Sequence, residues 1–179
     1  MDRCDEILAQ RLAGERMTFE EGIELFSCDL LRLGKAADAV TRQLHPGPVR
    51  TFIVDRNISY TNACIIDCDF CAFYRRPEHP EAYTLSMEEI LRKVGELAAI
   101  GGTQVLIQGG VNPKLPLDFY LDMIRTLRRQ FPQVTVHSFS VVEIDVIAKK
   151  EKLPLKEVLL RFKEAGLNSI PGGGAEILA

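Results

Sequence analysis

Three cysteines that lie close together are the residues of this sequence best suited to chemistry. Cys64, Cys68 and Cys71 have the spacing C-x₃-C-x₂-C, and the aromatic residue Phe70 stands directly before the third cysteine. Three thiolates can hold three irons of a 4Fe–4S cluster and leave the fourth iron without a protein ligand. An open coordination position is where a substrate or cofactor binds at a catalytic metal site. The motif therefore predicts a catalytic iron–sulfur centre.

Two other metal sites use the same residue types. A structural zinc site needs four ligands, and the only further candidate near the cysteines is His79. A ferredoxin-like electron carrier needs a fourth cysteine, which Cys4 or Cys28 would supply only by folding back. Both sites fit the motif less well than a cluster with one open iron. We therefore expect Cys4 and Cys28 to be ordinary thiols.

Composition and charge restrict the class of protein. The chain has 179 residues, of which 46% are hydrophobic and 26% charged, as in a soluble globular protein. Its net charge of −3 gives no electrostatic support for nucleic-acid binding. The apolar runs are far shorter than the roughly 18 residues that span a bilayer. The acidic N-terminus does not resemble a secretory signal, so we expect a cytoplasmic chain with reduced thiols and no membrane partner.

The elements that would position the cysteines fall into two parts. Residues 1–50 are predicted to be helical, with a capping box of Thr18 and Glu21 and an apolar face of Ile23, Phe26 and Leu30. From residue 51 onward, short apolar stretches alternate with helical patterns. The stretches are 51–54 with 58–61, 105–107, 134–139 and 167–170, and the helices cover about 86–101, 117–130, 143–150 and 154–166.

Four strands separated by helices at a spacing of about 30 residues predict an α/β fold with a parallel sheet that curls toward a barrel. A complete (β/α)₈ barrel needs about 250 residues. We therefore expect residues 51–179 to be an incomplete barrel domain, the N-terminal part of a larger enzyme, preceded by the helical segment 1–50. The chemistry of such a fold lies at the carboxyl ends of the strands.

Each predicted strand is followed by a loop with polar or glycine residues. These loops are the cysteine loop, Gln108-Gly109-Gly110, the segment 137–140, and a triple glycine followed by Glu176. His137 could equally be a hydrogen-bonded core histidine. Glu143 could simply be a helix N-terminal residue, which the helix dipole favours. Arg75 and Arg76 could bind a substrate carboxylate or be solvated charges.

The cysteine motif at the end of the first strand resembles that of the radical S-adenosylmethionine (SAM) superfamily. The resemblance implies a 4Fe–4S cluster on Cys64, Cys68 and Cys71 whose open iron chelates SAM. It also implies that an electron from the reduced cluster cleaves SAM to methionine and a 5′-deoxyadenosyl radical, which takes a hydrogen atom from the substrate. A low-potential electron donor such as flavodoxin or ferredoxin is implied as well.

The same resemblance implies three contacts with SAM. Phe70 would pack against the adenine, and the turn at Gln108, Gly109 and Gly110 would receive the SAM amino group through its backbone. The turn reads Gln-Gly-Gly where the superfamily commonly has Gly-Gly-Glu, so the backbone role carries over better than any side-chain role. We hypothesise that Glu176 contacts the SAM ribose hydroxyls.

The segments around these residues resemble the menaquinone-pathway branch of the superfamily. They are 71–75 with 78–86, 108–113, 137–144 and 171–178. This implies cyclisation of dehypoxanthine futalosine: hydrogen abstraction from the ribose, attack of the carbon radical on the benzoate ring, then loss of an electron and a proton. Aminofutalosine synthesis and deazaflavin-chromophore synthesis share the cluster loop and are alternatives, as is a cluster-binding fragment without catalytic activity. The sequence assigns no residue to the proton transfer.

Overall fold

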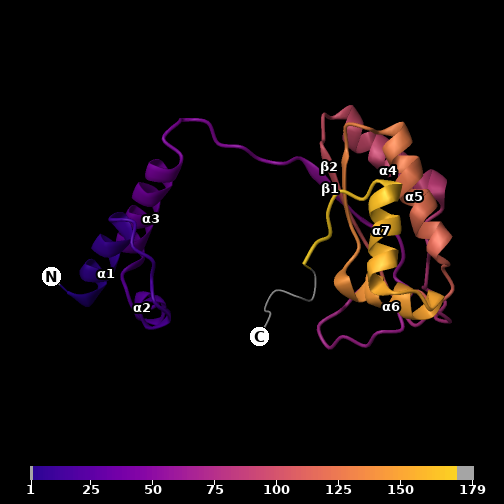
Figure 1. The fold of residues 1–179 in the computed structure, drawn as a ribbon, viewed down its shortest axis with the longest axis horizontal. Coiled ribbons are helices and arrows are strands. Elements are labelled where there is room, and N and C mark those ends of the chain that lie inside the picture. The colour runs from indigo at the N-terminus through magenta and orange to yellow at the C-terminus, as the bar shows by residue number, and fades with distance from the viewer. Residues whose placement is uncertain (1, 173–179) are drawn as a thin grey trace. The chain divides into compact units, whose positions relative to one another are not determined.

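The computed structural model describes residues 2–172, and the chain divides into two compact units between Thr51 and Phe52 (Figure 1). The N-terminal unit is helical, and the second unit combines a parallel sheet with helices. Glu176, to which a ribose contact was assigned, lies outside the described residues. None of the helices in residues 2–172 is long and apolar enough to cross a membrane.

The N-terminal unit contains α1 (Arg3–Leu12), α2 (Phe19–Leu25) and α3 (Leu30–Leu44). The predicted capping box is present at the start of α2: the Glu21 N–H donates to Thr18 Oγ1 at 3.2 Å, and the Thr18 N–H donates to the Glu21 carboxylate at 3.0 Å. The two bonds satisfy helix-end donors that have no partner within the helix. The start of α2 is therefore fixed by local sequence.

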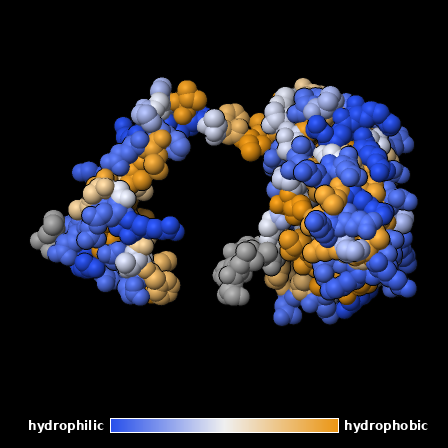
Figure 2. Space-filling model, in the orientation of Figure 1, coloured by the Kyte–Doolittle hydropathy of each residue, from blue (hydrophilic) through white to orange (hydrophobic). Residues whose placement is uncertain are grey.

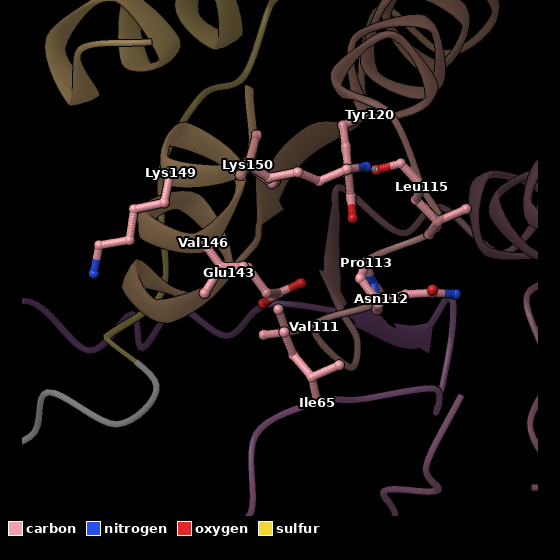
Figure 3. A pocket seen from close by; sticks show the side chains of 11 residues that line it. Ile65, Val111, Asn112, Pro113, Leu115, Tyr120, Glu143, Val146, Lys149 and Lys150 are labelled. Atoms are coloured by element: carbon pink, nitrogen blue, oxygen red, sulfur yellow. Dashed lines mark hydrogen bonds between the residues drawn. The ribbon is translucent and has the colours of Figure 1, made fainter. Parts of the chain in front are cut away.

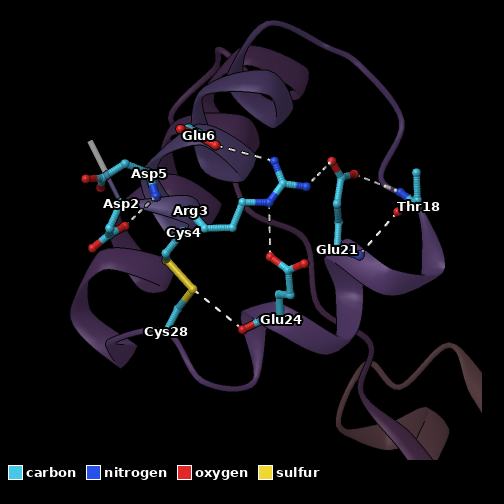
Figure 4. Close-up of polar contacts among 9 residues, drawn as sticks. All are labelled: Asp2, Arg3, Cys4, Asp5, Glu6, Thr18, Glu21, Glu24 and Cys28. Carbon is cyan, nitrogen blue, oxygen red and sulfur yellow. Dashed lines mark hydrogen bonds and ion pairs between the residues drawn. A yellow bond between two sulfur atoms is a disulfide. The ribbon is translucent and has the colours of Figure 1, made fainter.

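A disulfide and an ion-pair network connect the three helices (Figure 4). Cys4 and Cys28 form a disulfide, with Cα atoms 6.0 Å apart, so the expectation that they are ordinary thiols was wrong. The contact between α1 and α3 brings the two cysteines together, which their separation of 24 residues does not reveal. Arg32 donates two hydrogen bonds to Asp2 and lowers the pKa of that carboxyl to about 2.

The predicted apolar face of the first unit is not buried. Phe26 is 93% exposed and Leu30 is 78% exposed, and apolar side chains are visible on the surface of this unit (Figure 2). The helical spacing is interrupted because α2 ends at Leu25, so that Phe26 caps α2 and Leu30 begins α3. One continuous helical face therefore does not form.

The second unit is built on a parallel sheet of β1 (Asp55–Ser59), β2 (Gln104–Gln108) and β3 (Thr135–Ser138), in that spatial order. The helix α4 (Met87–Ala99) connects β1 to β2, and α5 (Leu117–Gln130) connects β2 to β3. This confirms the predicted α/β class with a parallel sheet. The parallel register places the carboxyl ends of β1 and β2 side by side, since Ser59 is paired with Gln108.

The two faces of this sheet differ in character. One face presents the buried side chains of Ile58, Val105, Ile107 and Val136, which belong to the same core cluster as residues of the surrounding helices. Ser59, Gln108 and His137 lie on the opposite face, where they are exposed or half-buried. Helices α4, α5 and α7 lie to one side of the strands (Figure 1). The polar face is therefore the one that points away from these helices.

Two predicted strands differ in the structure. Residues 51–54 are not a strand, because β1 begins at Asp55, and Phe52 is 85% exposed. Residues 167–170 form a single parallel bridge, between Ser169 and His137, instead of a fourth strand. The bridge extends the sheet next to β3 as the predicted fourth strand would.

The connection after β3 has an unusual backbone. Phe139 is fully buried and has φ of 65°, a left-handed conformation that costs a residue other than glycine about 1–3 kcal/mol. It turns the chain from β3 into α6 (Val141–Glu151), and Ser140 caps that helix. The aromatic ring packs at 5.1 Å from that of Phe162, in α7 (Leu155–Ala165). Burial of this ring offsets the backbone strain and fixes where α6 begins.

Candidate iron–sulfur and cofactor site

A cavity of about 390 Å³ lies at the carboxyl ends of β1 and β2. All the residues predicted to bind the cluster or SAM that lie within the described range line it. These residues are Cys64, Cys68, Phe70, Cys71, Gln108, Gly109 and Gly110. Tyr74, Tyr83 and Glu143 also border the cavity. Two loops that are more than thirty residues apart in the sequence therefore form one site.

The three cysteines are free thiols, with Cys64 buried and the other two half-buried. The backbone N–H groups of Ile66 and Val111 donate to Cys64 Sγ at 3.3 Å and 3.2 Å. These two hydrogen bonds fix the position of the Cys64 sulfur at the wall of the cavity. The Cys71 N–H donates to the Cys68 carbonyl at 3.0 Å and so closes a tight turn between these two cysteines.

This donor set suits a cluster better than a single metal ion. Within residues 2–172, no three His, Cys, Asp or Glu side chains are grouped around a point that one ion could occupy. His79, the alternative zinc ligand, instead accepts the Glu81 N–H on Nδ1 at 3.1 Å. Each cysteine of a 4Fe–4S cluster binds a different iron, so the sulfurs need only border a common space. Three soft thiolates around one cavity meet that condition.

Ion pairs hold the cysteine loop in place. The Tyr74 hydroxyl donates to Asp67 at 2.6 Å, and Arg76 donates to the same carboxylate at 2.8 Å. The hydrogen bond to Asp67 raises the pKa of Tyr74. Arg75 donates to Glu81 at 2.7 Å. Both arginines thus bind carboxylates of the protein itself in this structure.

The glycine turn after β2 is packed against the cysteine loop. A Cβ atom at Gly109 would lie 2.7 Å from the Tyr60 ring, and one at Gly110 would lie 2.3 Å from the Ala63 carbonyl oxygen. Real Cβ atoms do not approach other atoms so closely, so both positions require glycine in this conformation. The closeness brings the backbone of the turn to the wall of the cavity beside Cys64.

The N–H groups of the turn all point into the protein. Gly109 donates to Glu143 at 3.2 Å, Gly110 to the Thr61 carbonyl at 2.8 Å, and Val111 to Cys64 Sγ at 3.2 Å. By contrast, no donor in the described part of the chain reaches the carbonyl oxygens of Gly109 and Gly110. The turn therefore offers acceptors to a ligand. An ammonium group, which has only donors, is the complementary partner.

Glu143, expected near a strand end either as a ligand-facing residue or as a helix N-terminal residue, borders the cavity and also caps α6. Its side chain is buried and accepts hydrogen bonds from the Tyr60 hydroxyl at 2.7 Å, the Gly109 N–H and the Ser140 N–H at 2.6 Å. Burial raises the pKa of Glu143, and the hydrogen bonds from Tyr60, Ser140 and Gly109 oppose that rise. The pattern S-x-x-E at 140–143 is the sequence signal for this capping box.

A second cavity of about 310 Å³ shares Glu143 and Val111 with the cavity of the cysteines (Figure 3). Its lysines are already paired: Lys149 with Asp145 at 2.6 Å, and Lys150 with the Leu115 carbonyl at 2.6 Å. His137 lies apart from both cavities on the polar sheet face, with Nδ1 2.7 Å from the Ser169 hydroxyl.

The fold and the cysteine site are those of a known enzyme family. The family model of the Radical SAM superfamily matches residues 58–175, and the chain belongs to this family. The chain is similar to cyclic dehypoxanthine futalosine synthase of Halalkalibacterium halodurans, with 45% identity over 97% of this chain and 47% of the relative. It is 38% identical to aminodeoxyfutalosine synthase of Thermus thermophilus, over 99% of this chain and 48% of the relative.

A solved structure has the same fold. Methylornithine synthase superposes with a TM-score of 0.69 at 19% identity, covering 92% of this chain and 46% of that chain. The chain spans about half the length of the curated relatives it matches. The family implies a 4Fe–4S cluster and SAM, and the cysteines and the acceptor-rich turn fit these groups.

Proposed function

We propose that this chain binds a 4Fe–4S cluster through Cys64, Cys68 and Cys71 and binds SAM in the cavity beside the cluster. The observation that carries the proposal is that three free thiols border the same cavity as the glycine turn. When bound, the reduced cluster would supply the electron that cleaves SAM to a carbon radical. The three sulfurs leave one iron open for SAM, and Gly109 and Gly110 offer carbonyl oxygens to its amino group.

Phe70 is proposed to cover the adenine. Its ring is 87% exposed and borders the cavity, so an aromatic face is available without rearrangement of the core. Stacking on such a ring would remove apolar area of both partners from water. A contact between Glu176 and the SAM ribose hydroxyls is also proposed, on the basis of the sequence alone.

For the complete protein, we propose cyclisation of dehypoxanthine futalosine in menaquinone biosynthesis. The support is the identity of 45% to a relative with the corresponding name, which exceeds the 38% to aminodeoxyfutalosine synthase. The polar sheet face with Ser59, Gln108 and His137 offers hydrogen-bonding groups to a sugar-containing substrate. A flavodoxin or a ferredoxin is the proposed electron donor.

The proposal is tested with the chain reconstituted anaerobically with iron and sulfide, reduced, and mixed with SAM and dehypoxanthine futalosine. We expect 5′-deoxyadenosine together with the cyclised product. Deoxyadenosine without the cyclised product would support radical SAM chemistry and contradict dehypoxanthine futalosine as the substrate. Turnover of the aminodeoxyfutalosine synthase substrate instead would favour the second relative. A bound cluster with neither product would favour a cluster-binding fragment.

A further inference from the structure

The glycine turn depends on one buried carboxylate that comes from a different part of the chain. Glu143 lies 34 residues after Gly109, and its Oε1 atom accepts both the Gly109 N–H at 3.2 Å and the Tyr60 hydroxyl at 2.7 Å. Its Oε2 atom accepts the Ser140 N–H at 2.6 Å. One side chain thus joins the residue after β1, the turn after β2 and the start of α6.

We propose that Glu143 is a positioning residue for SAM, holding the Gly109 N–H inward so that the carbonyl oxygens of the turn remain for the SAM amino group. The proposal rests on the proposed function, because it assumes that SAM binds beside this turn. Glu143 acts through the backbone and needs no contact of its own with SAM. The residue is 3% exposed, so water does not compete for its hydrogen bonds.

The geometry explains why a carboxylate is required here. Three donors converge on the two oxygens of Glu143, from Gly109, Tyr60 and Ser140. A glutamine of the same size has only one oxygen, and its NH₂ group would face an N–H of the backbone. Either Gly109 or Ser140 would then lose its acceptor, and a buried N–H without a partner is costly. The turn or the start of α6 must shift in response.

Tyr60 supports Glu143 and the glycine turn from the hydrophobic core. Its ring is fully buried and lies against Tyr120 and Phe139 in edge-to-face contacts with centroids 5.9 Å and 6.1 Å away. This packing holds the hydroxyl at Glu143, while the same ring lies where a Cβ of Gly109 would be. The aromatic core and the buried carboxylate therefore fix the turn from two sides.

The test compares Glu143→Gln with Glu89→Gln in the reconstituted full chain. Glu89 forms the same type of capping box, with Ser86 at the start of α4, but it is exposed and does not reach the glycine turn. Both variants replace a capping carboxylate, and only Glu143→Gln also alters the group that accepts the Gly109 N–H. Iron content, SAM affinity by calorimetry, and the change that SAM causes in the electron paramagnetic resonance spectrum of the reduced cluster are measured.

We expect Glu143→Gln to keep its iron, to bind SAM at least about tenfold more weakly, and to show a reduced spectral change, since one charge-assisted hydrogen bond is lost. Glu89→Gln should bind SAM as the wild type does. If Glu143→Gln keeps both the affinity and the spectral change of the wild type, the proposal is wrong.

A second variant decides the matter if Glu143→Gln does not take up iron. Tyr60→Phe keeps the packed ring and removes one donor to Glu143. We expect it to retain the cluster and to weaken SAM binding by about threefold, the loss of a modest hydrogen bond. Unchanged affinity in Tyr60→Phe would then overturn the proposal. A wild-type chain that takes up a cluster and does not bind SAM would contradict the proposed function instead.

Discussion

The backbone N–H of Val111 donates a hydrogen bond to Cys64 Sγ at 3.2 Å. The two residues are 47 positions apart, and the bond joins the loop after β2 to the first cysteine of the motif. A second hydrogen bond runs in the opposite direction, from the Ile65 N–H to the Val111 carbonyl at 3.0 Å. The proposed cluster ligand and the proposed SAM-binding turn are thus one structural unit, and changes in either should affect both.

The first prediction concerns the three free cysteines. Serine at Cys64, Cys68 or Cys71 should abolish uptake of a stable cluster, because a hydroxyl is a poor ligand for iron in place of a thiolate. Iron and sulfide content after anaerobic reconstitution measures the effect. The control is Cys28→Ser, which removes a cysteine of the N-terminal unit and should leave the iron content unchanged. Equal iron in Cys71→Ser and the wild type would argue against the cluster site.

The second prediction concerns the space at the glycine turn. Gly110→Ala should destabilise the chain by about 1–3 kcal/mol, since its Cβ would meet the Ala63 carbonyl and Cys64 Cβ at 2.3 Å and 2.9 Å. Urea unfolding measures the change, and weaker SAM binding should accompany it. The matched control is Gly47→Ala, where nothing lies within 4 Å of the added atom. An unaltered unfolding midpoint for Gly110→Ala would show that the turn can relax.

The third prediction concerns the disulfide of the N-terminal unit. Reduction of Cys4–Cys28 should destabilise this unit by about 3 kcal/mol, the value for a loop of this size. Thermal unfolding with and without reductant measures it. Cys4→Ser should reproduce the reduced state and make the unfolding insensitive to reductant. A wild-type chain that alkylates fully at Cys4 and Cys28 without prior reduction would contradict the disulfide.

The fourth prediction concerns the pH dependence of stability. Because the pKa of Glu143 is raised by burial above its ordinary value of 4.5, the folded protein holds this proton more tightly than the unfolded chain. Its contribution to stability should be greatest below pH 4.5 and should be lost as the pH rises through the folded pKa. The difference in unfolding free energy between wild type and Glu143→Gln, measured at a series of pH values, checks this. A difference that rises with pH would contradict it.

Local patterns predicted the parts of the fold that depend on near neighbours. The capping box of Thr18 and Glu21 follows from residues three positions apart and is present, and the helix predicted from about residue 86 begins after Ser86 as its cap. The pair Ser140 and Glu143 has the same spacing, but the helix was predicted to begin only near residue 143, so this capping box was not predicted.

Long-range pairing explains the remaining differences. The apolar residues Phe52 and Ile53 suggested a strand, whereas pairing with β2 places the strand at Asp55–Ser59. The Cys4–Cys28 disulfide depends on the contact between helices α1 and α3. The roles of Tyr60 and Glu143 emerge only when the ends of β1, β2 and β3 meet.

The inward N–H groups of the glycine turn have a consequence for which nucleotides can enter. SAM and ATP share adenosine and differ in what the 5′ carbon carries, an amino acid on sulfur or a chain of phosphates. Glycine-rich turns that hold phosphates present free N–H groups to them. Here those donors are bonded to Glu143, Thr61 and Cys64, and acceptors remain. The backbone of this turn would thus offer the phosphates of ATP no N–H donor, whereas the amino group of SAM would meet carbonyl acceptors.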